Sequence, residues 1–416
     1  MAGRGHGHGG VGRATEAFYA RHRVLLHSLI LSIVGIATGA ATVASVQQGY
    51  SVMDVALLVG GAVLAAGTAA IYTRKLGLGF IAGVVPLFGL AWAAPMSAGS
   101  TFGVVPLLAY AFGYSLAVML IQNVLRRELG DDAMENPRKA AIAAAGLLAV
   151  FALLWFWHTQ SAAAAYQATV DILGVIASTL MLVPIGVTFL HFDESYVAEA
   201  NRVGERRQRL LENLAMVAVP RWGMSIAGIC IIFLAMAWFG AQPAFVIIHG
   251  ASVPVIAVVS VGVVFLIATT LCGGWREGFA VTIVAGLVWL STLWSFALLG
   301  GARRLSLVGA AELVVLLLFL ALIGARRAQA YVVQRDNPSI ARLRAVEDAA
   351  PSQIFASLGA LAALAPSIAI HHAYAAYAVG LVFAAVGAIA FVPALATACE
   401  LLLPRRQSVE EIYRRH

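Results

Sequence analysis

The chain has 416 residues, of which 61% are hydrophobic and only 11% are charged. A soluble domain carries about a quarter charged residues, so this composition excludes an ordinary soluble protein. The formal net charge of +7 comes almost entirely from arginine in short polar segments, a pattern that indicates membrane topology and not nucleic-acid binding. The three isolated cysteines (Cys230, Cys272 and Cys399) form neither a metal-binding spacing nor a disulfide framework.

Apolar runs of about 20 residues recur along the whole chain, and each can cross a hydrocarbon core about 30 Å thick. Because backbone in lipid must satisfy its own hydrogen bonds, the predicted fold class is an all-α polytopic membrane protein. A flexible, Gly-rich tail at 1–23 comes first. We predict about twelve transmembrane helices after it, at 24–46, 53–73, 78–97, 102–125, 140–158, 167–190, 222–240, 248–271, 279–299, 305–325, 353–371 and 374–402.

The distribution of lysine and arginine predicts the orientation of these spans. If the N-terminus is cytoplasmic, the inner segments hold 25 of the 27 basic residues, and the outer loops hold only Arg303 and Arg304. We therefore expect a bacterial-type inner-membrane protein with both termini in the cytoplasm. The polar connector 191–221 is expected to contain an amphipathic helix on the inner leaflet, and 403–416 forms a cytoplasmic tail.

The two halves of the chain resemble each other. Each has a tight cytoplasmic hairpin after its second span, at 73–80 and 273–279, and a longer charged loop after its fourth, at 126–139 and 326–352. Each sixth span contains a Val-Pro pair. Since six spans are an even number, 24–190 and 222–402 are predicted to be parallel six-helix repeats, with the fourth and tenth spans at the central pseudo-twofold axis.

Several of these segments resemble the resistance–nodulation–division (RND) superfamily of transporters. The stretch from Phe265 to Val284, with Gly273-Gly-Trp-Arg-Glu-Gly278 at its turn, is similar to the hairpin between the second and third spans of an RND repeat. The segment 211–222 is similar to the entry of the seventh span in the MmpL-like branch. Further similar segments are the end of the fourth span at 121–130, the start of the eleventh at 351–364, and the last span with its exit at 380–406.

Two departures from the RND pattern bear on function. Family members carry large extracytoplasmic domains after the first and seventh spans, whereas the corresponding gaps here are only about 47–52 and 241–247. Proton-driven members also carry acidic residues in the middle of the fourth span. Those positions fall near Tyr114 and Ser115, and a hydroxyl group cannot exchange a proton near neutral pH as a carboxyl group can. The resemblance therefore implies the membrane core of an RND protein without the porter domains and usual relay acids.

The remaining ionisable residues within the spans are candidates for function because their burial in a membrane is costly. Glu312 in the tenth span and Asp171 in the sixth form a candidate titrating pair towards the outer side. Against this interpretation, we predict that Arg303 or Arg304 pairs with an ionised Glu312, so that the residue supports stability more than proton flux. Glu400 is expected to lie at the inner headgroups near Arg405 and Arg406, in a structural role.

Three functions remain open. The RND resemblance implies a transporter of a hydrophobic or lipid-like molecule, with membrane lipids as partners. The missing domains and acids instead favour a transport-inactive scaffold that binds partner subunits. Twelve spans with inside termini are also typical of a major-facilitator-type carrier. No phosphate-binding loop, catalytic nucleophile or metal-ligand spacing is present, so we expect no enzyme activity and no cofactor. The substrate and oligomeric state stay open.

Overall fold

The computed structural model describes residues 52–94, 103–128, 141–142, 146, 162–188, 223–248, 253–299, 307–333 and 338–402. These segments are helical apart from short turns and contain no β-strand, which confirms the all-α class. The predicted first span, nearly all of the fifth, the connector 191–221 and both tails lie outside the described residues. The count of twelve spans and the domain boundaries therefore stay predictions.

The described helices follow the predicted order closely. In chain order they are α2 (Val52–Thr73), α3 (Leu76–Ala93), α4 (Val104–Glu128), α6 (Ala162–Thr188), α8 (Gly223–Ile248), α9 (Val253–Cys272), α10 (Trp275–Leu298), α11 (Leu307–Val333), α12 (Pro338–Ile370), the short η4 (His372–Tyr374), α13 (Ala375–Val386), the π-helical turn η5 (Gly387–Phe391) and α14 (Val392–Leu402). Within these residues, nine helices are long and apolar enough to cross a membrane, if the run from η4 to α14 is counted once. The chain is a multi-pass membrane protein.

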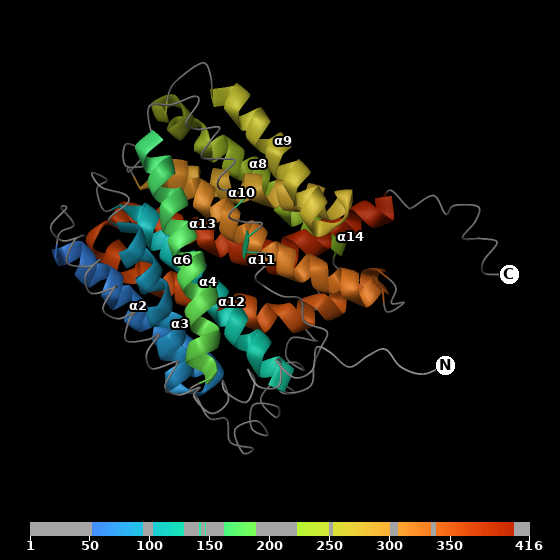
Figure 1. Ribbon diagram of the computed structural model, residues 1–416. Coiled ribbons are helices and arrows are strands. Elements are labelled where there is room, and N and C mark those ends of the chain that lie inside the picture. The colour runs from blue at the N-terminus through green and yellow to red at the C-terminus, as the bar shows by residue number, and fades with distance from the viewer. Residues whose placement is uncertain are drawn as a thin grey trace, which may run out of the picture.

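The helices differ in burial according to their place in the bundle, whose arrangement is shown in Figure 1. All of the apolar core segment of α4 is buried, as is 78% of that of α11, whereas only 22% is buried in α2 and in α8. The rings of Phe112 on α4 and Phe319 on α11 contact each other, with centroids 5.1 Å apart. The spans numbered four and ten thus lie together at the centre, the position that the repeat predicts for them.

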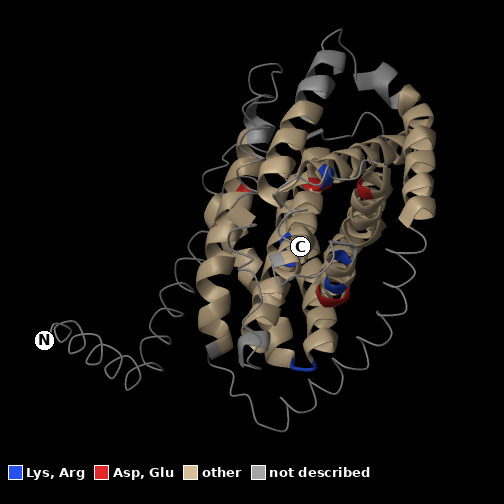
Figure 2. Cartoon of the chain, turned by 90° about the vertical axis from the view of Figure 1, so that its right-hand side faces the viewer, with Lys and Arg blue, Asp and Glu red and all other residues tan. Residues whose placement is uncertain are grey.

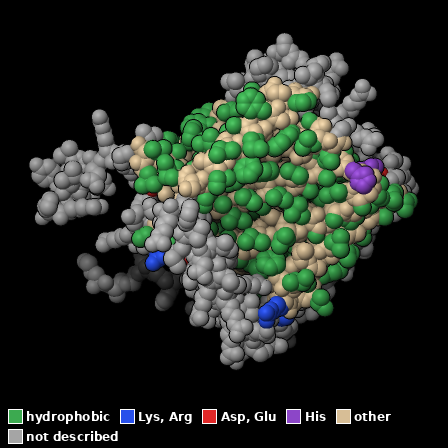
Figure 3. Space-filling model, turned by 180° about the vertical axis from the view of Figure 1, so that it is seen from behind, with side chains coloured by type: hydrophobic (Ala, Val, Ile, Leu, Met, Phe, Trp, Pro, Cys, Tyr) green, Lys and Arg blue, Asp and Glu red, His purple; other side chains and the backbone are tan. Residues whose placement is uncertain are grey.

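The outer surface is suited to lipid. Seen from behind, the molecule presents a broad face of hydrophobic side chains, with histidines at one margin (Figure 3). Such a face would be unfavourable in water but is normal for a protein whose solvent is the hydrocarbon core. Charged residues are few along the described helices and gather in small groups (Figure 2). We therefore consider these charged groups as candidate functional sites.

The two tight hairpins have the same local geometry, 199 residues apart. Arg74, between α2 and α3, and Gly273, between α9 and α10, both adopt the left-handed region, with φ of 56° and 69°. Each is followed by an extended residue, Lys75 or Gly274, whose carbonyl oxygen accepts the first hydrogen bond of the next helix. We call this side of the bundle the hairpin end. The sequence predicts that it is cytoplasmic.

Close backbone contact continues the correspondence between the hairpins. A Cβ atom on Gly79 would lie 2.6 Å from the Cβ of Ala70, and a Cβ on Gly278 would lie 2.1 Å from Oγ1 of Thr269. These two glycine positions, and the two positions they face, are again 199 residues apart. Glycine allows the paired helices to touch along their backbones, which is how transmembrane helices associate tightly.

The long helix α12 joins the two halves of the chain. Its Phe355 ring stacks on Tyr72 of α2 with centroids 4.4 Å apart, and Gly61 of α2 faces the backbone of Ala363 so closely that a Cβ would lie 2.2 Å from its oxygen. On another side, Gly359 makes room for the ring of Tyr114 on α4. The eleventh span is therefore fixed against the first half, although it belongs to the second in sequence.

One predicted loop is wrong, and one predicted span has an irregular turn. The segment 326–352 is not a loop, because α11 continues to Val333 and α12 begins at Pro338, which leaves four residues between them. Pro351 lies inside α12, so the helix continues through this proline although its backbone cannot donate a hydrogen bond. The last span is also not one uniform α-helix. It contains a π turn just before Pro393, a residue that cannot donate the backbone hydrogen bond that a regular helix requires.

The hairpin contact predicts a specific cost of substitution. We expect Gly278→Ala to lower stability by about 1–3 kcal/mol, because the new methyl group would overlap Thr269. Gly262→Ala on the facing helix α9 is the control, since nothing lies within 4 Å of its Cβ position. Thermal unfolding of both variants in detergent is the measurement. Equal melting temperatures would contradict the close contact.

Candidate functional site

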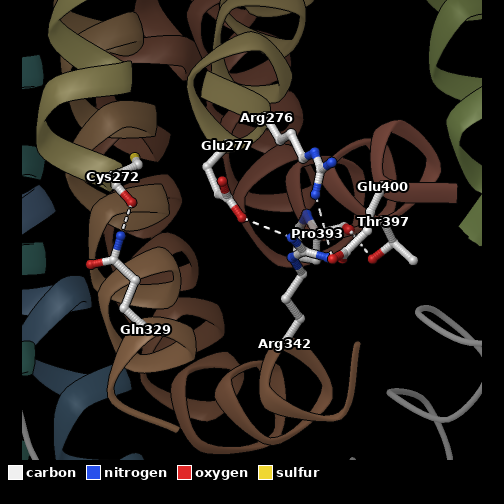
Figure 4. Close-up of polar contacts among 8 residues, drawn as sticks. All are labelled: Cys272, Arg276, Glu277, Gln329, Arg342, Pro393, Thr397 and Glu400. Carbon is white, nitrogen blue, oxygen red and sulfur yellow. Dashed lines mark hydrogen bonds and ion pairs between the residues drawn. The ribbon is translucent and has the colours of Figure 1, made fainter. Parts of the chain in front are cut away.

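Four charged residues form a compact group at the hairpin end, which we call the ionic cluster: Arg276, Glu277, Arg342 and Glu400 (Figure 4). Arg342 donates to Glu400 at 2.5 Å through Nη1 and to Glu277 at 2.9 Å through Nη2. Arg276 lies 3.5 Å from the other carboxylate oxygen of Glu400. Two cations and two anions therefore alternate, and each carboxylate has at least one guanidinium partner.

Local sequence places these groups. The left-handed turn at Gly273 starts α10 at Trp275, which puts Arg276 and Glu277 in its first turn. Glu277 there is favourable because the N-terminus of a helix attracts negative charge. The adjoining α11 supports the turn, since Gln329 donates to the carbonyl oxygen of Cys272 and Arg326 to that of Leu271 at 3.0 Å. Those carbonyls end α9 and would otherwise lack helical partners.

The cluster joins three helices that are far apart in sequence. Arg342 comes from α12, Glu400 from α14, and the other pair from α10. The guanidinium side chains are only 7% and 9% exposed and the carboxylates 22%, so the charges are partly shielded from water. Removing one partner from such a group leaves an uncompensated charge, which costs far more than the loss of a surface ion pair.

Sequence reasoning expected a structural role for Glu400 but missed this cluster and its ion-pair partners. The partners of Glu400 are Arg342 and Arg276, whereas Arg405 and Arg406 lie outside the described residues. The available signal was the concentration of charge at the predicted inner ends of α10, α12 and α14. Spacing alone could not choose the pairs, because Arg342 is 65 residues from Glu277 and 58 from Glu400.

A small cavity of about 30 Å³ lies directly beside the cluster, between α11, α12 and the segment from η5 to α14. Glu277 and Arg342 lie at its edge, Gln353 supplies a further polar group, and most of the remaining lining is alanine. A space of this size admits one or two water molecules. The hairpin end thus has a hollow whose edge is formed by half of the ionic cluster.

The second polar group is the candidate pair from the sequence, Asp171 and Glu312, which the structure brings together between α6 and α11. Their residues are only 2% and 3% exposed, and the two carboxyl groups lie near enough to interact electrostatically. Oδ2 of Asp171 and both carboxylate oxygens of Glu312 have no hydrogen-bond partner among the described residues. The amide of Gln167, one helical turn before Asp171, lies beside that carboxyl group.

The location of the pair separates it from the ionic cluster. Glu312 is about 8 Å along α11 from Leu307, and Asp171 about 14 Å along α6 from Ala162, at 1.5 Å per residue. Both helices start at the side opposite the hairpin end. Arg303 and Arg304 lie outside the described residues, so their pairing with Glu312 stays a prediction. Within the described part, the charged group that acts on Glu312 is another acid.

Tyr114 and Ser115, at the positions of the family's relay acids, have structural hydrogen bonds. The Tyr114 hydroxyl lies 2.7 Å from Oγ1 of Thr68, which itself donates to the carbonyl of Ala65. Tyr114 is therefore the donor. Ser115 donates to the carbonyl oxygen of Ala111 in its own helix, at 2.8 Å. Both residues are fully buried. Tyr114 thus links α4 to α2, whereas the bond of Ser115 stays within α4, and the structure does not bring either residue together with a carboxyl group among the described residues.

No described group of three or more histidine, cysteine, aspartate or glutamate residues is arranged to hold a metal ion. The chemistry available to the two polar groups is ion pairing in the cluster and proton binding at the two acids. The ionic cluster can hold helices together, and the Asp171–Glu312 pair can bind a proton between two helices.

Comparison with known proteins supports the fold. Searches of family models and of curated proteins find no match to this sequence. The structure is similar to that of SecDF, a protein of the RND superfamily, crystallised in its super-membrane-facing form, with a TM-score of 0.50 and 11% sequence identity. The similarity covers 83% of this chain and 63% of the SecDF chain. The protein thus has an RND-like fold and spans about two thirds of the length of SecDF.

The role assigned to Tyr114 can be tested by removing one oxygen atom. We expect Tyr114→Phe to lower the free energy of unfolding by about 1 kcal/mol, because the bond to Thr68 is lost without a change in ring packing. Tyr110→Phe, which removes the 2.8 Å bond to the carbonyl oxygen of Gly83, should cost a similar amount. Chemical denaturation in detergent is the measurement. A much larger loss in Tyr114→Phe alone would indicate a further role for this hydroxyl.

Proposed function

We propose that this protein is an RND-like transporter of the inner membrane that moves a hydrophobic or lipid-like molecule, and that protonation of the Asp171–Glu312 pair is linked to its movement. The RND-like fold supports a transporter, and the buried carboxyl pair is the observation that carries the proposal. The MmpL-like resemblance of the sequence favours a lipid-like substrate. Cytoplasmic termini follow from the distribution of lysine and arginine.

The physical argument for the pair is repulsion in a medium of low dielectric constant. Two ionised carboxylates in an apolar interior repel each other, and binding of a proton by either one relieves that repulsion. Adding or removing that proton changes the force between α6 and α11. Because α6 belongs to the first half of the chain and α11 to the second, the change acts across the boundary between the repeats. Ionisable residues inside a membrane are costly, and functional use is the usual reason for their presence.

The connections between helices bear on the class of substrate. Only the four residues 249–252 separate α8 from α9, so no extramembrane domain is inserted there. A water-soluble cargo would need a receiving domain of the kind that RND proteins carry. A hydrophobic or lipid-like molecule can instead reach the helices sideways, from the bilayer, across the apolar face seen in Figure 3.

The same short connection favours a second candidate function, a transport-inactive scaffold for partner subunits. About a third of the SecDF chain has no counterpart in the similarity. A partner protein could supply what is missing, with this chain as its membrane anchor. The RND-like fold, on the other hand, gives the major-facilitator alternative no support.

The test uses reconstituted protein and a fluorescently labelled phospholipid as the probe. With an imposed pH gradient, we expect accelerated movement of the probe across proteoliposomes that contain the wild type. Asp171→Asn and Glu312→Gln should each reduce the gradient-dependent rate by about tenfold or more, because neither amide can exchange a proton. Both variants should keep or gain thermal stability, since an amide removes the repulsion between two acids.

Two controls make the outcome decisive. Ser115→Ala alters a buried hydroxyl without touching the pair and should leave the gradient-dependent rate unchanged. A Glu312→Gln protein that is strongly destabilised but transports normally would support the ion pair with Arg303 or Arg304 instead. Wild-type liposomes without gradient-dependent movement, together with a stoichiometric partner in the purified sample, would support the scaffold.

A further inference from the structure

We propose that the ionic cluster is a latch that closes the cavity between α11, α12 and α14 to water, and that it opens by movement of α14 about the π turn η5. The inference concerns the hairpin end and does not depend on what the protein transports. It rests on three features of the structure that coincide at one place: a group of ion pairs, a cavity, and an irregular turn in the cavity wall.

The latch and the cavity share residues. Glu277 and Arg342 bond to each other at 2.9 Å, and both line the cavity. Their bond lies between α10 and α12, and the 2.5 Å bond from Arg342 to Glu400 continues the closure to α14. Separation of Arg342 from its two carboxylates would remove the contacts that hold the edge of the cavity together.

The two sides of the latch differ in how firmly they are held. On one side, α12 is fixed by the stacked rings of Tyr72 and Phe355 and by the backbone contact of Gly61 with Ala363. On the other side, Glu400 lies near the end of α14, the eleven-residue segment that follows the π turn η5 in the last span. We therefore assign the opening movement to α14, while α12, which carries Arg342, stays in place.

A hinge is present at the start of α14. The π turn Gly387–Phe391 interrupts regular hydrogen bonding, and Pro393 at the second position of α14 has no N–H to restore it. Ala388 in the turn and Pro393 both line the cavity. Rotation about this turn moves Glu400 away from Arg342 and widens the cavity at the same time.

Once the latch is open, the side chains of the cavity wall do not block the entry of water. Most of its lining is alanine, so no large side chain can swing in to refill the space. Its deeper polar group is Gln353, which is 2% exposed and donates to the carbonyl oxygen of Leu320 at 2.8 Å. Water that enters would find polar groups at the edge and at Gln353, which is sufficient to hold it.

Thiol labelling measures the opening directly. In full-length protein with Cys230, Cys272 and Cys399 changed to alanine, Ala349→Cys places a thiol on the cavity wall, at a position that is 1% exposed. The protein is incorporated into lipid nanodiscs and treated with a membrane-impermeant thiol reagent. We expect slow labelling with the latch intact, and labelling faster by about tenfold or more after Arg342→Gln or Glu400→Gln.

The controls separate local opening from general loosening. Arg344→Gln removes a charge from an exposed position two residues from Arg342 and should leave the labelling rate unchanged. A thiol at Ala109, fully buried on α4, should stay unreactive in every variant. Rapid labelling of Ala349→Cys before the latch is broken, an unchanged rate after it is broken, or an equal increase at Ala109→Cys would each overturn the proposal.

Discussion

Close contact between helix backbones is the constraint on which the rest of this structure depends. Lipid is as apolar as a leucine side chain, so burial of apolar surface does not drive helices together inside a bilayer, and van der Waals packing must do so. Small residues provide that packing at Gly61 against Ala363, and at Gly79 and Gly278 within the two hairpins. Where the helices touch this closely, every side chain nearby has a fixed position, including the few that are polar.

Those contacts explain why charge appears where it does. The α9–α10 hairpin, fixed by Gly278, holds Arg276 and Glu277 at the end of the bundle, and the packing of α12 against α2 and α4 brings Arg342 to meet them. In the interior, the centre of α4 is filled by Tyr114, which packs on Gly359 and bonds Thr68. The position where the RND resemblance leads us to expect acids is thus occupied by a helix contact, whereas the buried acids Asp171 and Glu312 lie on α6 and α11.

The sequence predicted those parts of the fold that depend on local chemistry. Hydropathy located the described spans, and the tight hairpins at 73–80 and 273–279 were predicted, but the left-handed conformation of Arg74 and Gly273 within them was not. The ends of α11 and α12 were misplaced because charged residues such as Arg327 and Arg342 were interpreted as a loop, whereas helices can continue beyond the apolar core. The π turn before Pro393 has no signature that separates it from a kink. The ion pairs depend on three-dimensional packing over 58 and 65 residues, which periodicity cannot reveal.

The candidate acids also show that contacts between distant segments cannot be predicted from local sequence. Asp171 and Glu312 were singled out because each is ionisable inside a span, which is a local property, but whether they meet depends on how α6 approaches α11. The same helix α11 carries Glu312 and also lines the cavity beside the ionic cluster. From Glu312 to Ala328, which lines the cavity, α11 rises about 24 Å as a regular helix. Because one regular helix forms part of both places, the packing that buries Glu312 also positions the wall of the cavity beside the ionic cluster.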